Sequence, residues 1–368
     1  MQKLLFAPIH AWTRKLMVTE KKLSLKRTVP FLLVGILIFV AYLYFFVGIP
    51  EIVTIIQRVN LFYYGIAGVV LLLNMLTDSL TWQFFLRLLS IKVSLRKTFL
   101  YTCIGVFVDL LVPAESISGD ATKAYLMTKR SGENAGKVVA SVVGHRILSM
   151  IIPLGSLIFS FALLYIRKIN VPVVVSGLTL LIIVGTFISL FFIFLFSLKE
   201  KLAQRLIDSL LRFLGFVTRG RLNINSIKTK AIKALSAFHD SIDTFRKNPK
   251  SLVPPILFSL TGWFLSILLS YLVFVSLGQQ VDFLIIMAVH SISVTIQSIP
   301  LGIPAEVGVI DTAMTWLYGL LAVEFTVGAA ATVLIQILRV WLRILIGFVA
   351  VQAVGIKNLA EDLRQDLF

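Results

Sequence analysis

Long runs of apolar residues recur along the chain and are separated by short polar segments. A helix of about 20 apolar residues crosses the hydrocarbon core of a bilayer. The pattern therefore predicts an all-α polytopic membrane protein. The predicted transmembrane helices cover residues 29–49, 61–89, 138–166, 171–197, 252–277 and 328–354.

Two further apolar runs are too short to cross a bilayer and end at prolines. Residues 98–112 stop at Pro113, and residues 283–299 stop at a Pro-Leu-Gly-Ile-Pro sequence before 307–321 turn back. Basic residues flank the first run on both sides, which favours a re-entrant hairpin over a crossing. Irregular backbone at membrane depth is tolerated only where it is buried in protein or lines a cavity.

The two short runs belong to an internal repeat. Residues 113–115 read Pro-Ala-Glu and are followed by Asp120, while residues 304–306 read the same and are followed by Asp311, an offset of 191 residues in both cases. The same offset relates the starts of the apolar runs at residues 61 and 252. We expect a first repeat at 29–166 and a second at 171–354, each with spans and a Pro-broken hairpin.

Composition supports the membrane assignment, since 58% of residues are hydrophobic and 14% are charged. A soluble enzyme or secreted domain this apolar could not cover its surface with polar groups. The net charge of +17 concentrates in residues 1–28, net +6, and 198–250, net +8. Because cytoplasmic segments are rich in Lys and Arg, we expect both stretches on the cytoplasmic side of the cell inner membrane. The predicted order of spans places the tail 355–368 on the same side.

This topology places the two repeats in opposite orientations, the plan of inverted-repeat transporters. The segment 198–250 is expected to form amphipathic helices on the membrane surface. Nucleic acid is not an expected partner, because no polar domain remains to bind it. The single Cys103 excludes an intrachain disulfide, and the four histidines lack metal-site spacing, so we expect neither a metal nor a cofactor.

Ionisable residues inside apolar segments are costly and mark functional candidates. These residues are Asp78, Asp109, Glu115, Asp120, His145, Arg146, His290, Glu306, Asp311, Arg339 and Arg343. Structural roles compete with functional ones. Asp78 and His290 could form hydrogen bonds with neighbouring helices. Glu115 and Glu306 could accept hydrogen bonds from backbone amides of the hairpins. Asp120 and Asp311 could cap the N-termini of helices.

Arg339 and Arg343 give the sharpest signal, because residues four apart share a helix face. Two guanidinium groups cannot both face lipid, so they pair with carboxylates such as Glu306 or Asp311, or they bind an anion. A guanidinium fits phosphate oxygens well, and Arg146 would be its counterpart in the first repeat. The competing hypothesis is an enzyme that uses the Glu115/Asp120 and Glu306/Asp311 pairs for acid–base catalysis. No nucleophile or cofactor motif supports it.

At these residues the sequence resembles the flippase-like transmembrane domain of lysylphosphatidylglycerol synthases. The first shared signature is Pro113 followed by Gly-Asp-Ala-Thr-Lys-Ala-Tyr-Leu at 119–126, and its basic residue, Lys123, joins the candidate site. A second is Ser-Val-Val at 141–143 with Arg146, where the family pattern has an acid in place of His145. The third is Gly-Val-Ile-Asp-Thr-Ala at 308–313, followed by Arg339 in the next span.

The resemblance covers roughly residues 29–354 and implies movement or presentation of a lipid across the bilayer. Aminoacylated phosphatidylglycerol is the cargo of the fused relatives, whereas this chain ends at Phe368 with no expected synthetase domain. We therefore expect a lipid flippase-like protein, not an enzyme, that binds an anionic lipid headgroup at a midplane site. The alternatives are an accessory subunit that presents a lipid-linked substrate to a membrane enzyme, and an embedded lipid-modifying enzyme. The sequence is also compatible with a homo-oligomer.

Overall fold

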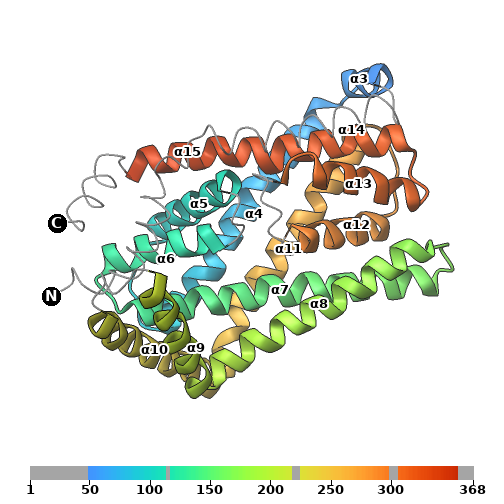
Figure 1. Ribbon diagram of the computed structural model, residues 1–368. Helices are drawn as coiled ribbons and strands as arrows, with labels where there is room; N and C mark the ends of the chain where they lie inside the picture. The colour runs from blue at the N-terminus through green and yellow to red at the C-terminus, as the bar shows by residue number, and fades with distance from the viewer. Residues whose placement is uncertain (1–48, 113–116, 218–223, 298–305, 355–368) are drawn as a thin grey trace.

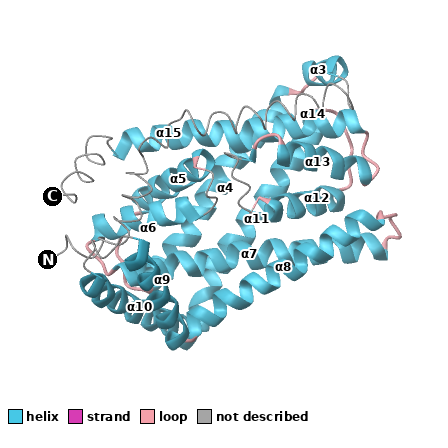
Figure 2. Cartoon of the chain, in the orientation of Figure 1, coloured by secondary structure: helices cyan, strands magenta, loops and turns pink. Residues whose placement is uncertain are grey.

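The computed structural model describes residues 49–112, 117–217, 224–297 and 306–354, and every regular element in these residues is helical (Figures 1 and 2). Five helical stretches are long and apolar enough to cross a bilayer. They are α4 (Leu61–Leu88), α7 (Ala135–Ile166), α8 (Val173–Leu198), Pro249–Ser276, which includes α11 (Val253–Ser276), and Phe325–Val354. The all-α, multi-pass prediction is confirmed, while residues 29–48 of the predicted first span lie outside the described residues.

Polar caps begin the long helices where the hydropathy pattern changes. Asn60 and Asn134 precede α4 and α7, and their side chains accept hydrogen bonds from the backbone amides of Phe62 (3.0 Å) and Gly136 (2.8 Å). Asp282 caps α12 (Phe283–Ile296) in the same way, through the amide of Leu284 at 2.9 Å. Such caps satisfy amides that the first helical turn leaves without partners.

Both predicted Pro-broken segments are pairs of short helices. The first pair is α5 (Leu95–Leu111) and α6 (Ile117–Ser131), which pack against each other. The second pair is α12 and α13 (Val309–Leu320). The proline loops themselves, at 113–116 and 298–305, lie outside the described residues, and whether each pair is re-entrant in a membrane stays a prediction.

At the centre of the protein α4 packs against α11; the two helices run through the middle of the view in Figure 1 and share the most extensive contact of any two helices described. Gly262 permits this approach, because a β-carbon there would lie 2.8 Å from the hydroxyl of Thr77. Asn74 of α4 donates a hydrogen bond to the carbonyl oxygen of Gly262 at 2.8 Å. This contact joins the two helices beside the polar site described below.

The basic segment forms α9 (Glu200–Val217) and α10 (Ile224–Lys247), which lie together at one end of the molecule in Figure 1. α10 packs on the start of α7, where Gly136 faces the backbone of Ala234 without room for a β-carbon. Phe245 of α10 is buried, while Lys233 and Arg246 are exposed. The segment is therefore two helices with one side turned to the protein, and its contact with a membrane surface stays a prediction.

The last span is not a uniform α-helix. It begins at Phe325, three residues before the predicted start at Gly328, as α14 (Phe325–Gln336), continues through a π-helical turn (Ile337–Leu342), and ends as α15 (Arg343–Val354). Turns of this kind widen the helix by one residue and occur frequently at functional sites. Arg339 lies within this π turn, and Arg343 opens α15.

Candidate functional site

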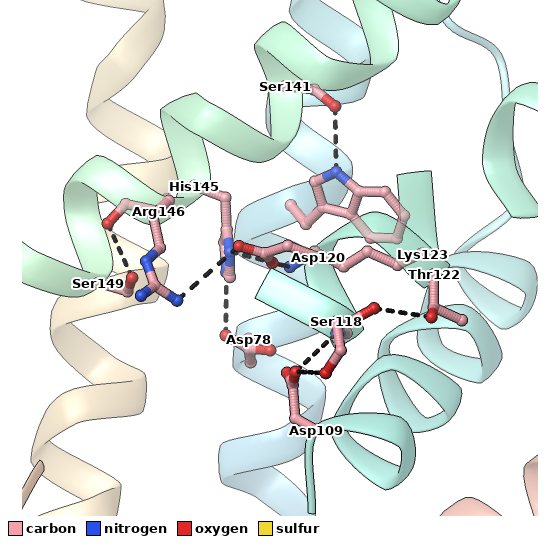
Figure 3. A network of polar contacts seen from close by, with 12 residues as sticks. Asp78, Asp109, Ser118, Asp120, Thr122, Lys123, Ser141, His145, Arg146 and Ser149 are labelled. Atoms are coloured by element: carbon pink, nitrogen blue, oxygen red, sulfur yellow. Dashed lines mark hydrogen bonds and ion pairs between the residues drawn. The ribbon is translucent and has the colours of Figure 1, made fainter. Parts of the chain in front are cut away.

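The first of two polar clusters lies between α4, α6 and α7 (Figure 3). We call its members Asp78, Asp120, Lys123, His145 and Arg146 the first cluster. His145 connects two of them: its Nε2 lies 2.9 Å from Oδ1 of Asp78, and its Nδ1 lies 3.4 Å from Nζ of Lys123. Three helices are thereby joined through one imidazole.

Carboxylates neutralise the cations of the first cluster. Nζ of Lys123 lies 2.7 Å from Oδ1 of Asp120, and a guanidinium nitrogen of Arg146 lies 3.9 Å from Oδ2 of the same residue. Lys123 is 6% exposed and also sits 5.4 Å from the ring centroid of Trp82, a cation–π geometry. The family-type signature at 119–126 thus supplies a buried, paired lysine.

Asp109, at the end of α5, holds the start of α6. Its Oδ1 accepts hydrogen bonds from the hydroxyl of Ser118 (2.8 Å) and the amide of Gly119 (2.6 Å), as Figure 3 shows. The two helices approach so closely that a β-carbon on Gly105 would lie 3.0 Å from the carbonyl oxygen of Gly119. Asp109 and the two glycines therefore set the angle between α5 and α6.

The second cluster joins the last span to α4, α11 and α12, and consists of Asn74, His290, Arg339 and Arg343. A guanidinium nitrogen of Arg339 lies 3.4 Å from Nδ1 of His290, whose Nε2 lies 3.0 Å from the hydroxyl of Ser266. Arg343 donates a hydrogen bond to Oδ1 of Asn74 at 2.8 Å. His290 is fully buried and packs on Trp263, with ring centroids 5.0 Å apart.

The two arginines of the second cluster have only neutral hydrogen-bond partners. No ion pair between residues of the described ranges includes Arg339 or Arg343. Asp78 of α4 attracts Arg343 electrostatically without a direct ion pair. Within the described residues, neither Glu306 nor Asp311 therefore forms the expected ion pair with these arginines.

The acidic residues of the second hairpin lie at the start of α13 and not in the second cluster. Oδ2 of Asp311 accepts a hydrogen bond from the amide of Gly308 at 2.6 Å, so this carboxylate caps the start of α13. Glu306 is fully buried directly before that helix, with a positive φ of 50°. The third predicted acid, Glu115, lies outside the described residues.

A cavity of about 550 Å³ is lined by residues of both predicted repeats. Arg146 and Asp109 line it from the first repeat, and Arg339 and Arg343 line it from the second. Its volume falls within the range of about 300–1,000 Å³ that is common for ligand pockets. The predicted residues Asp120, Lys123, Glu306 and Asp311 do not line this cavity.

The walls of the cavity are irregular at two points. Pro153 of α7 lines it together with Ser149, and a proline cannot donate the usual helical hydrogen bond to the carbonyl four residues earlier, that of Ser149. On the opposite side the π turn contributes Arg339 and Val340. α8 forms a further wall through Leu181, Ile182, Gly185, Thr186 and Ser189.

Several contributing residues were missing from the predicted binding set. In the sequence, Asp109 and His290 stand out only as ionisable groups in apolar segments, and Asn74 gives no such signal because it carries no charge. A search for every strongly polar side chain in the spans, amides included, would have found Asn74. Within the described residues, no group of three or more His, Cys, Asp or Glu side chains could hold a metal ion.

Together these features define a multi-pass α-helical membrane protein with an arginine-lined cavity between its two halves. Residues 32–347 match the family described as the lysylphosphatidylglycerol synthase TM region, and the chain belongs to that family. The resemblance inferred from residues 119–126, 141–146 and 308–313 is thereby confirmed.

Relatives from archaea align along most of the chain. A UPF0104 membrane protein of Pyrococcus horikoshii is 26% identical over 315 residues, which cover 85% of this chain and 93% of the relative. A UPF0104 membrane protein of Methanothermobacter thermautotrophicus is 27% identical over 327 residues, 87% of this chain and 94% of its own length. One from Methanocaldococcus jannaschii is 25% identical over 337 residues, with coverage of 89% and 95%. No solved structure matches the chain.

Proposed function

We propose that this protein binds the phosphate-bearing headgroup of an anionic membrane lipid in the arginine-lined cavity and moves that headgroup across the bilayer. The single observation that carries the proposal is the pair Arg339 and Arg343, which face a common cavity with neutral partners only. Two like charges held together inside a membrane protein repel each other and lose hydration. An anion between them would remove both costs.

The chemistry of the cavity matches a phosphate group. Guanidinium groups donate paired hydrogen bonds to phosphate oxygens, and Arg146 can add a third donor from the first repeat. Gln297 and Gln336 also line the cavity and can contact ester or hydroxyl oxygens of a headgroup. Nothing in this arrangement requires a reaction, so we propose binding and transport without catalysis.

The proposed transport mechanism uses the two helical hairpins as an inverted pair. At an offset of 191 residues, α4, α6 and α7 correspond to Leu252–Gln279, 308–322 and 326–357, close to the observed α11, α13 and the last span. If the repeats have opposite orientations, α5–α6 and α12–α13 enter the membrane from opposite sides, and rocking of one repeat against the other alternates access to the cavity. The basic α9 and α10 would then lie on the cytoplasmic side of the inner membrane, together with the N-terminus.

The test is retention of lipid by the purified protein. We expect native mass spectrometry to find an anionic lipid, chemically unaltered, on the wild-type protein, and to find it lost in the double variant Arg339→Gln/Arg343→Gln. The matched control is Arg167→Gln/Lys168→Gln, which removes two basic residues at the end of α7, away from the cavity. Equal lipid on both double variants would reject the proposal, and an altered lipid product would indicate an enzyme.

A second candidate function, presentation of a lipid-linked substrate to a partner enzyme, is favoured by one observation. α10 is seated directly on α7, the helix that carries Arg146, so a partner docked on the basic segment would adjoin the helix that lines the cavity. Reconstitution of the purified protein in vesicles distinguishes the two functions. Headgroup translocation by the protein alone supports transport, and bound lipid without translocation supports presentation.

A further inference from the structure

The wall of the cavity formed by α8 differs from the other walls in its packing. α8 is 26 residues long, yet only Val175, Thr179, Ile182, Leu190 and Ser197 are buried. Large apolar side chains elsewhere on the helix are exposed, among them Val184, Phe187, Ile188, Phe191 and Phe192. In a multi-pass membrane protein, this surface meets the hydrocarbon of the bilayer.

One stripe of α8 belongs both to the cavity and to this outer surface. Leu181, Gly185 and Ser189 lie four residues apart, on one face of the helix, and all three line the cavity. All three are also exposed, Leu181 by 67%. The adjacent Ile182 lines the cavity as well and is 5% exposed, so the cavity runs from a buried inner edge to an open outer edge beside α8.

The stripe is narrow and carries little bulk at its middle. Apart from its chain neighbours and the backbone of its own helix, nothing lies within 4 Å of the position that a β-carbon on Gly185 would take, and Ser189 is small. Thr186 uses its hydroxyl to donate to the carbonyl of Ile182 at 2.8 Å, so it presents mainly its methyl group. A hydrocarbon chain could lie in this opening without leaving a polar group of these residues newly unpaired.

We infer that the stripe Leu181–Gly185–Ser189 is a lateral portal, where the hydrocarbon chains of a lipid leave the cavity for the bilayer while its phosphate stays at Arg339 and Arg343. The inference rests on the proposed function and deepens it: the ligand is a lipid and not a water-soluble phosphate. Continuity of the stripe with the arginine-lined cavity argues for this occupant. Arg339 and Arg343 supply charge for the phosphate, and the exposed apolar residues of α8 supply the surface for the chains.

The test fills the portal with a side chain. Gly185→Trp places an indole in the opening, where the open space around Gly185 allows it without disturbing the core. The matched control is Gly177→Trp in the same helix, because Gly177 is also exposed and also has nothing within 4 Å of its β-carbon position, yet it does not line the cavity. Each protein is purified from the same membranes, and bound lipid is counted by native mass spectrometry.

The expected result is at least a fivefold loss of anionic lipid from Gly185→Trp and full retention in Gly177→Trp. Equal retention in both variants, with loss in Arg339→Gln/Arg343→Gln, would overturn the portal and leave the proposed headgroup site intact. Retention in all three variants would instead reject the headgroup site.

A second measurement separates a lipid from a soluble anion. Glycerol phosphate, which has the phosphate but no chains, is added to delipidated protein, and thermal stabilisation is recorded. We expect equal stabilisation of wild type and Gly185→Trp, because the indole closes the portal and not the arginine site. Stabilisation by glycerol phosphate together with no lipid on the wild-type protein would overturn the inference in favour of a water-soluble ligand.

Discussion

The two polar clusters use similar residues but differ in charge balance. Each contains a buried histidine between a cation and a polar group from another helix: His145 joins Lys123 to Asp78, and His290 joins Arg339 to Ser266. The first cluster is rich in carboxylates that neutralise its cations, whereas the cations of the second have neutral partners.

This difference separates a structural role from a binding role. Complete ion pairs in the first cluster stabilise the packing of its helices and leave little capacity for a ligand. Arg146 is the exception, because its contact with Asp120 is 3.9 Å long and it also lines the cavity. Cations whose partners are neutral retain most of their attraction for an anion. We therefore expect substitutions in the first cluster, Arg146 excepted, to reduce stability and substitutions in the second to reduce ligand binding.

The largest expected effect is that of Asp120→Asn. This substitution leaves the buried Lys123 without its carboxylate, 2.7 Å away, and breaking a buried pair on one side costs on the order of 3 kcal/mol. Thermal unfolding in detergent should show a clearly lower midpoint. The double variant Asp120→Asn/Lys123→Met, which removes both charges, should recover part of the loss; no recovery would show that the pair is not what stabilises this region.

Arg343→Gln should act on binding and not on stability. The glutamine amide can still donate to Asn74, and the repulsion from Arg339 disappears, so we expect the free energy of unfolding without lipid to change by less than about 1 kcal/mol. Loss of one charge-assisted hydrogen bond to phosphate should weaken lipid binding about tenfold or more. A fall in stability comparable to that of Asp120→Asn would show that the comparison between the clusters is wrong.

His290→Leu tests whether neutral partners orient the arginines. Without the imidazole, the guanidinium of Arg339 loses its acceptor at 3.4 Å, and Ser266 loses its partner, at a cost of about 1–2 kcal/mol. Lipid affinity should fall several-fold as Arg339 moves from its position. His290→Gln provides an acceptor at a similar reach, and we expect it to bind lipid better than His290→Leu in the same native mass spectrometry measurement.

The smallest expected effect is that of Trp82→Phe in the first cluster. The phenyl ring keeps the apolar packing and part of the cation–π contact with Lys123, but it loses the hydrogen bond that the indole donates to Ser141 at 3.1 Å. We expect a loss of about 1 kcal/mol in unfolding free energy and unchanged lipid binding. A change in bound lipid would connect the first cluster to the ligand directly.

Hydropathy alone was sufficient to predict most of the helices. The observed α4, α7, α8 and α11 agree with the predicted spans within a few residues at each end, because a membrane span needs a long apolar run that few other structures require. The arginines of the last span were identified for a related reason, since charge is rare and costly inside such runs.

Contacts between distant segments could not be predicted. Arg343 and its partner Asn74 are 269 residues apart, and only the packing of the last span against α4 brings them near each other. The wall formed by α8 was not predicted either. Leu181, Gly185 and Ser189 are ordinary residues of a membrane span, and only their position at the cavity makes them important. Asp311 was assigned to the binding set, yet its carboxylate caps α13, and a short sequence pattern does not distinguish these roles.

The π turn at Ile337–Leu342 has a consequence for how the last span fits two neighbours at once. Upstream, Gly328 packs on Tyr318 of α13; downstream, Gly347 packs on Phe107 of α5 so closely that a β-carbon would not fit. One additional residue in a turn rotates everything beyond it by about 100° relative to a regular α-helix. The two halves of the span therefore have independent helical phases, each matched to a different hairpin, and the arginines stand where the phase changes. Deletion of one residue from this turn would leave Gly328 and Gly347 in the sequence. It would nevertheless turn one of these two glycines away from the hairpin that it contacts.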